Sequence, residues 1–115
     1  MAGIWGRRPV VPDVTAAEVQ QRLATGEDLF VLDVREPYEY AAGHIAGSTL
    51  IPLGELSWHI ADLPQDRPIV AVCHVGERSQ LAAALLQRAG FGQVANLQGG
   101  MDAWEGAGLP VETGR

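Results

Sequence analysis

The sequence contains no lysine and only one cysteine, and each shortage excludes a class of chemistry or structure. Without lysine, the chain cannot use a Schiff base or a lysine nucleophile. With Cys73 alone it cannot form an intramolecular disulfide, which argues against a small secreted scaffold and favours a reducing compartment. Any thiol that resolves a covalent intermediate on Cys73 must therefore come from another molecule.

Long apolar runs and clusters of positive charge are also missing. No stretch approaches the roughly 20 apolar residues of a membrane span. Arg7 and Arg8 near the N-terminus are not followed by the apolar segment of a signal peptide. The formal net charge is −6, with no basic stripe that would suit nucleic acid. We therefore expect a soluble cytoplasmic protein with no membrane or nucleic-acid partner.

The composition is otherwise that of an ordinary globular domain. A length of 115 residues and a hydrophobic content of 47% are typical of one domain with one core. We expect a single domain over residues 1–115, with an N-terminal extension and the first strand in residues 1–12. The bias toward arginine and alanine is typical of a GC-rich bacterial coding sequence.

Short β-branched runs alternate with helical patterns along the chain. The expected strands cover residues 10–11, 29–33, 49–51, 69–72 and 94–97. The expected helices cover residues 15–26, 36–40, 53–59, 79–89 and 101–106. This alternation predicts an α/β fold, with a mostly parallel central sheet of about five short strands flanked by helices on both faces. The helix at 79–89 is apolar almost all round, which predicts that it is buried against another part of the fold.

Residues 72–79, Val-Cys-His-Val-Gly-Glu-Arg-Ser, join a predicted buried strand to this helix. Ligands of parallel α/β sheets bind beyond the carboxyl ends of the strands, where Cys73 lies. A cysteine nucleophile must be a thiolate, and the helix N-terminus and Arg78 supply positive charge. Gly76 permits the positive φ angles that turn successive N–H groups toward one anion, and Ser79 is a suitable N-cap. The loop therefore predicts a thiolate at the base of a cup of donors.

Cys73 has three other interpretations. A lone cysteine in an apolar strand is most often a core residue, but the polar loop after Cys73 favours a nucleophile. Cysteine phosphatases use Cys-x5-Arg, one residue longer than the spacing from Cys73 to Arg78, so a phosphatase is a remote alternative. A zinc site with His44, His59 or His74 lacks the Cys-x2-Cys or His-x3-His spacing, so we expect no metal and no other cofactor.

Several motifs, in order along the chain, resemble those of the rhodanese-like sulfurtransferase family. The resemblance covers residues 15–111. Its motifs are VLDVREPYEY at 31–40, GHIAGS at 43–48, IP at 51–52, CHVGERS at 73–79, LQGGMDAW at 97–104 and AGLPV at 107–111. The resemblance implies a small single-domain α/β protein, and the loop from Cys73 to Arg78 has the length that the family uses for sulfur chemistry.

The activity that the resemblance implies is a ping-pong sulfur transfer. Cys73 would attack the outer sulfur of a donor, such as thiosulfate or a persulfide, become a persulfide and pass the sulfur to a thiol or cyanide. The loop residues that would bind the substrate are His74, Val75, Gly76, Glu77, Arg78 and Ser79. The alternative is a sulfur-carrier or protein-interaction module that a partner protein of a sulfur relay loads. Thiosulfate-specific relatives tend to carry positive charge in this loop, so Glu77 should weaken binding of that dianion unless its side chain points to solvent.

Three polar residues outside the loop belong to the predicted site or its support. Arg35 and Asp33 lie at or just past a strand end. Arg35 either binds substrate by attracting anions to the entrance, or forms a structural pair with Asp33 that fixes the next loop. His44, in the Gly-His-Ile stretch, is expected to be a hydrogen-bonded structural residue.

Overall fold

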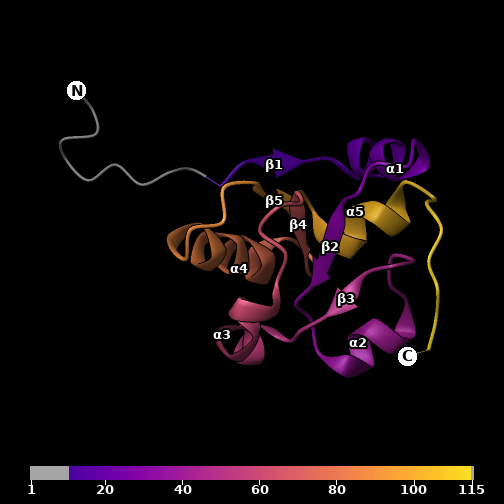
Figure 1. Cartoon of the computed structure of the whole chain (residues 1–115). Helices are drawn as coiled ribbons and strands as arrows, with labels where there is room; N and C mark the ends of the chain where they lie inside the picture. The colour runs from indigo at the N-terminus through magenta and orange to yellow at the C-terminus, as the bar shows by residue number, and fades with distance from the viewer. Residues whose placement is uncertain (1–10, 115) are drawn as a thin grey trace.

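The computed structural model describes residues 11–114, and within them five parallel strands form one sheet (Figure 1). The strands are β1 (Asp13–Val14), β2 (Phe30–Asp33), β3 (Thr49–Leu50), β4 (Ile69–Val72) and β5 (Val94–Leu97). Their order across the sheet is β1-β5-β4-β2-β3. β4 therefore lies at the centre, between β5 and β2, where a loop at its end can be held from both sides.

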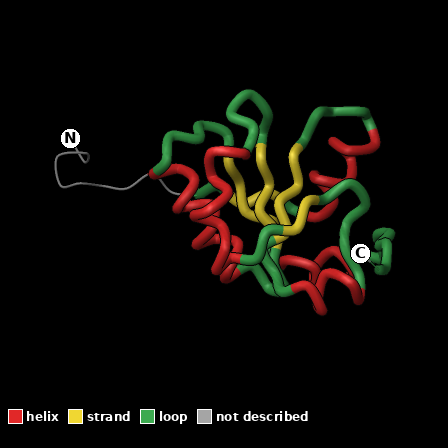
Figure 2. Tube along the Cα trace, turned by 60° about the horizontal axis from the view of Figure 1, so that its bottom comes forward, coloured by secondary structure: helices red, strands yellow, loops and turns green. Residues whose placement is uncertain are grey.

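Helices cover both faces of this sheet. They are α1 (Ala16–Ala24), α2 (Pro37–Ala42), α3 (Leu56–His59), α4 (Glu77–Arg88) and α5 (Gly100–Gly106), with 3₁₀ turns at Leu53–Glu55 and Ile60–Asp62. α3 and α4 lie on one side of the sheet and α1 and α5 on the other (Figures 1 and 2). The predicted α/β fold with a parallel sheet between helices is confirmed. Across residues 11–114, each helix is too short or too polar to span a bilayer.

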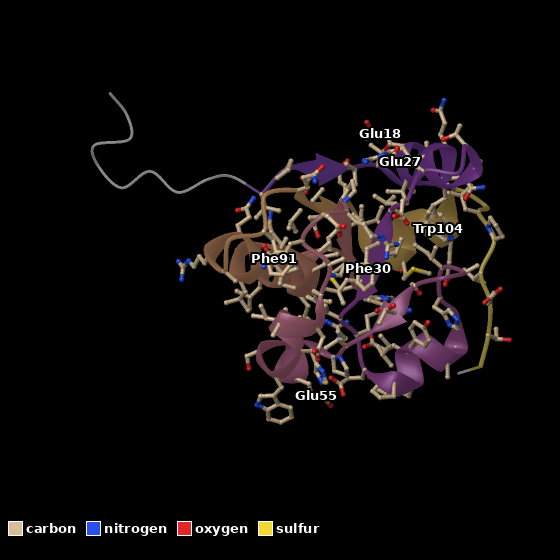
Figure 3. All side chains as sticks on the ribbon, viewed as in Figure 1. Glu18, Glu27, Phe30, Glu55, Phe91 and Trp104 are labelled. Atoms are coloured by element: carbon tan, nitrogen blue, oxygen red, sulfur yellow. The ribbon has the colours of Figure 1, made fainter. Side chains whose placement is uncertain are left out.

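Side chains of the central strands alternate between two cores. Leu32 packs toward α3 and α4, and Val31 packs toward α1 and α5. Phe91 belongs to the first core and Trp104 to the second, on opposite sides of the sheet (Figure 3). Burying a side chain of this kind contributes roughly 1.5–3 kcal/mol. Both helical layers are thus held on the sheet, and β4 is fixed between them.

The first strand lies later than the sequence predicted. Val10 falls outside the described residues, and Val11 is not in a strand. β1 starts after Pro12, with Asp13 opposite Asn96 of β5. Proline has no N–H for a ladder and is confined to sheet edges and strand starts. Here its carbonyl accepts from the Asn96 N–H at 2.8 Å, so Pro12 precedes β1 and takes part in its pairing with β5.

α4 begins two residues before its predicted start and is exposed on one side. Its N-cap is Gly76, in the left-handed region at φ 104°, and a Cβ there would lie 3.4 Å from the Gly99 nitrogen. Ser79 is therefore not the N-cap but a fully buried residue of the first turn. The helix is buried against the sheet through Ala82, Ala83 and Leu86, while Leu81 on its outer face is 54% exposed. The helix is an outer layer, and only one of its faces packs on the sheet.

Candidate active site

Cys73 immediately follows β4, at the carboxyl edge of the sheet, and its side chain is fully buried. The start of α5 holds the backbone of the loop. Met101 donates its N–H to the Cys73 carbonyl at 2.8 Å, and Asp102 donates to the His74 carbonyl at 3.0 Å. The thiol is therefore attached to a backbone that both the sheet and α5 fix.

Gly100 makes this approach of α5 possible. Its φ is 58°, and a Cβ would lie against the Cys73 carbonyl oxygen and within 2.6 Å of the His74 carbonyl. Only a residue without a side chain can occupy this position without displacing the loop. The sequence shows a Gly-Gly pair there, but its contact with the Cys73 loop depends on packing between distant segments.

The sulfur of Cys73 is surrounded by donors from the loop and α4. The Gly76 N–H donates to Sγ at 3.1 Å, and the Ser79 hydroxyl oxygen lies 3.2 Å from Sγ. Burial acts to raise the pKa of Cys73, but hydrogen bonds from the Ser79 hydroxyl and from the N–H groups of Ser79, Gly76 and Val75 outweigh it, so the pKa is lowered. The side chains of Val75 and Glu77 are exposed. The backbone and Ser79 thus form the cup that the sequence predicted.

Arg78 belongs to a bidentate ion pair. Its two terminal nitrogens donate to the Glu39 carboxylate of α2 at 2.8 and 2.9 Å. These hydrogen bonds lower the pKa of Glu39 to about 2 despite partial burial, and they raise the pKa of Arg78. The charge of Arg78 also interacts with Cys73. Arg78 therefore ties the loop to α2, a partnership that the sequence analysis did not anticipate.

Arg35 and Asp33 form a buried pair. Arg35 is 4% exposed, and its Nε and Nη2 donate to Asp33 oxygens at 2.9 and 2.8 Å. Nη2 also donates to the Gly43 carbonyl at 2.8 Å. The two partners of Arg35, Asp33 and the Gly43 carbonyl, lie on either side of α2. The contacts therefore hold the chain where it enters and leaves this helix, which favours the structural interpretation of the pair.

The histidines lie in three separate places. His44 is buried and stacks on Tyr40, with ring centroids 3.7 Å apart, and its Nδ1 lies 2.7 Å from the Tyr40 carbonyl oxygen. His59 is the last residue of α3, and its Nδ1 lies 3.6 Å from an Asp62 oxygen. His74 is the histidine at the Cys73 loop, and its Nε2 lies 3.5 Å from an Asp102 oxygen.

A cavity of about 360 Å³ opens beside the loop. Its charged lining comprises Arg35, Glu39, Asp102 and Glu105, with His74 at the loop side. Arg35 is already paired with a carboxylate and Glu39 with a guanidinium. The remaining carboxylates, Asp102 and Glu105, leave this entrance net negative.

Asn96 and Asp13 are site residues that the sequence analysis missed. Asn96 is a buried amide in the otherwise apolar β5, and its Oδ1 lies 2.5 Å from the Ser79 hydroxyl oxygen. Its Nδ2 donates to an Asp13 oxygen of β1 at 3.0 Å. A polar residue within an apolar strand was the available signal, but its partners depend on strand order and helix placement.

Comparisons with known proteins agree with this geometry. A family model described as "Rhodanese-like domain" matches residues 15–107. A sulfurtransferase of Allochromatium vinosum is 37% identical over 102 residues, which cover 89% of this chain and 95% of that protein. The putative sulfur carrier protein YrkF of Bacillus subtilis is 38% identical over 96 residues, 84% of this chain but 52% of that protein. The crystal structure of a rhodanese-related protein from Thermoplasma volcanium superposes with a TM-score of 0.81, at 33% identity, over 88% of this chain and 97% of that one.

Proposed function

We propose that the chain, which belongs to the rhodanese-like domain family, is a sulfurtransferase whose Cys73 carries the transferred sulfur as a persulfide. The observation that carries this proposal is the buried sulfur of Cys73 within reach of the Gly76 N–H and the Ser79 hydroxyl. The Gly76 N–H stabilises an anionic sulfur, and the Ser79 hydroxyl can do so when its proton points to Sγ.

The reaction has two displacement steps. In the first, the Cys73 thiolate attacks the outer sulfur of a donor such as thiosulfate. The sulfur–sulfur bond of the donor breaks, sulfite departs with the bonding electrons, and Cys73 becomes a persulfide. In the second, a thiolate or cyanide attacks the outer sulfur, and the Cys73 thiolate is the leaving group. Because the chain has one cysteine, the acceptor is another molecule.

The intact mass of the protein before and after exposure to thiosulfate tests the proposal. The wild type should gain one sulfur atom that cyanide then removes as thiocyanate. Cys73→Ser is nearly isosteric and should fold while gaining none. Sulfur transfer that persists in Cys73→Ser would contradict the assignment of Cys73 as the carrier.

A second candidate is a sulfur carrier that a partner protein loads. The acidic entrance beside the loop favours it, because Asp102 and Glu105 disfavour a small dianionic donor, and one relative is named a putative sulfur carrier. A carrier should acquire sulfur from a protein persulfide but not from thiosulfate. The same mass measurement with both donors separates the two functions, and hydrolysis of an aryl phosphate would instead indicate the remote phosphatase alternative.

A further inference from the structure

Four polar side chains from four different segments form a line from the surface to the nucleophile. Asp13 lies at the exposed end on edge strand β1, and Asn96 and Ser79 lie in the interior at 4% and 0% exposure. Cys73 is at the inner end. Asp13 and Asn96 face each other in the register of β1 and β5, so the backbone fixes their pairing.

The carboxylate at the surface determines the direction of the hydrogen bonds. A carboxylate only accepts, so the atom of Asn96 that faces Asp13 must be the amide nitrogen. The amide oxygen of Asn96 then faces Ser79, and it also only accepts. The Ser79 hydroxyl must therefore supply the proton between these two oxygens, which are 2.5 Å apart.

The hydroxyl of Ser79 has one proton and two acceptors. Donation to Asn96 Oδ1 leaves Ser79 with a lone pair for Sγ, which suits a protonated thiol. Donation to Sγ, 3.2 Å away, suits a thiolate but leaves the Asn96 oxygen without its donor. We propose that Asp13, acting through Asn96, directs the Ser79 hydroxyl proton away from the Cys73 sulfur. Asp13 and Asn96 are therefore positioning residues that oppose formation of the Cys73 thiolate.

The inference rests on the proposed function only in treating Cys73 as a sulfur carrier. In that cycle the inner sulfur alternates between a thiolate, which needs a donor, and a persulfide, whose inner sulfur is a weak acceptor. The Ser79 proton can follow this alternation, toward Sγ when the thiolate leaves and toward Asn96 when the persulfide forms. The line of side chains would thus offset part of the stabilisation that the backbone N–H groups give the resting thiolate.

Other charged groups lie near the sulfur, and the test must hold them constant. They are the Arg78–Glu39 pair from α4 and α2, the neighbouring His74 and Asp102 from the loop and α5, Glu77 at the start of α4, and the Arg35–Asp33 pair after β2. None of them contacts Asp13 or Asn96 through a hydrogen bond among residues 11–114. A substitution at Asp13 therefore leaves their pairing intact.

The Asp13→Asn variant tests the inference, because the new amide can present either of its atoms to Asn96. Asn96 can then turn its NH₂ toward Ser79 and release the hydroxyl proton to the sulfur. The pKa of Cys73, measured from the pH dependence of its alkylation by iodoacetamide, should fall by roughly half a unit to one unit, the worth of one hydrogen bond. Cys73 is the only cysteine, so the rate reports it alone.

The same substitution in a Ser79→Ala background is the matched control. Loss of the negative charge of Asp13 acts equally in both backgrounds, whereas the proton switch needs the hydroxyl. The shift should therefore shrink to less than half when Ser79 is replaced. Equal shifts in the two backgrounds, or no shift in either, would overturn the inference.

Asn96→Leu gives a second, nearly isosteric test, since it removes the competing acceptor itself. It should lower the pKa of Cys73 in the same direction, with folding verified by thermal unfolding. A pKa that rises in this variant would also contradict the inference. The alkylation readout does not depend on sulfur transfer, so a protein that shows the coupling but never forms a persulfide would refute the proposed function alone.

Discussion

At the scale of single residues, the site depends on pairs that hold donors in place. Arg78 does not lie free in the loop, because Glu39 of α2 occupies both of its terminal nitrogens. The sequence placed Gly76 and Ser79 in the loop after Cys73, and both lie beside the sulfur, although Ser79 is not the N-cap that local preference predicts. It could not indicate the partner of Arg78, because the two residues are 39 positions apart and meet only when α2 and α4 are packed.

The Arg78–Glu39 pair predicts a pH-dependent loss of stability. The pKa of Glu39 is about 2 in the folded protein and near 4.5 in the unfolded chain. The pair therefore adds stability that is complete above pH 4.5 and is lost as the pH falls toward 2. Glu39→Gln should be less stable than the wild type at pH 7, by about 1 kcal/mol or less because Arg78 is partly exposed.

Urea unfolding of wild type and Glu39→Gln at pH 7, 4 and 2.5 measures this difference. The gap between their free energies of unfolding should narrow through the acid range and nearly close at the lowest pH. A gap that stays constant with pH would show that Glu39 contributes by packing and not by its charge.

At the scale of elements, local sequence patterns predict where strands and helices lie, whereas the residues at which they begin and end depend on contacts with distant segments. Serine is a good N-cap by local preference, yet α4 starts at Glu77 because Gly76 has the left-handed backbone that the close approach to Gly99 requires. Likewise, β1 starts after Pro12, at Asp13, because Asp13 pairs in register with Asn96 of β5. Local sequence carries propensity but not the position of a segment 20 or 80 residues away.

The junction of α5 with the Cys73 loop predicts a contrast between two glycines of one helix. A Cβ on Gly100 would collide with the Cys73 and His74 carbonyls, whereas a Cβ on Gly106 would meet open space. Gly100→Ala should therefore destabilise the protein by about 1–3 kcal/mol through its positive φ, and by more where the loop cannot move. It should also impair Cys73 alkylation or sulfur transfer, because the loop backbone must shift.

Gly106→Ala is the matched control in the same helix and should leave both properties nearly unchanged. Thermal unfolding and the alkylation rate of both variants test the contrast. Equal effects at the two positions would mean that α5 does not fix the loop and that the Gly-Gly pair serves only the turn.

At the scale of the whole molecule, the net charge opposes binding of an anionic sulfur donor such as thiosulfate. The formal net charge is −6, the entrance beside the loop carries Asp102 and Glu105, and the loop itself carries the exposed Glu77. Composition predicted this sign, and the fold concentrates part of it at the site. A like-charged field lowers the local concentration of a dianion and is screened by salt.

The dependence of thiosulfate use on ionic strength follows from this field. Raising the ionic strength from 0.01 to 0.15 M shortens the screening length from about 30 to about 8 Å, so kcat/KM for thiosulfate should rise, by about threefold.

Glu77→Gln should raise kcat/KM for thiosulfate at low salt and flatten its dependence on salt. Asp28→Asn removes one exposed charge before β2, at the opposite edge of the sheet, and should change neither. If kcat/KM falls with salt, or if the two variants behave alike, the charge around the loop does not disfavour thiosulfate, and a small anionic donor fits the site better than a protein donor.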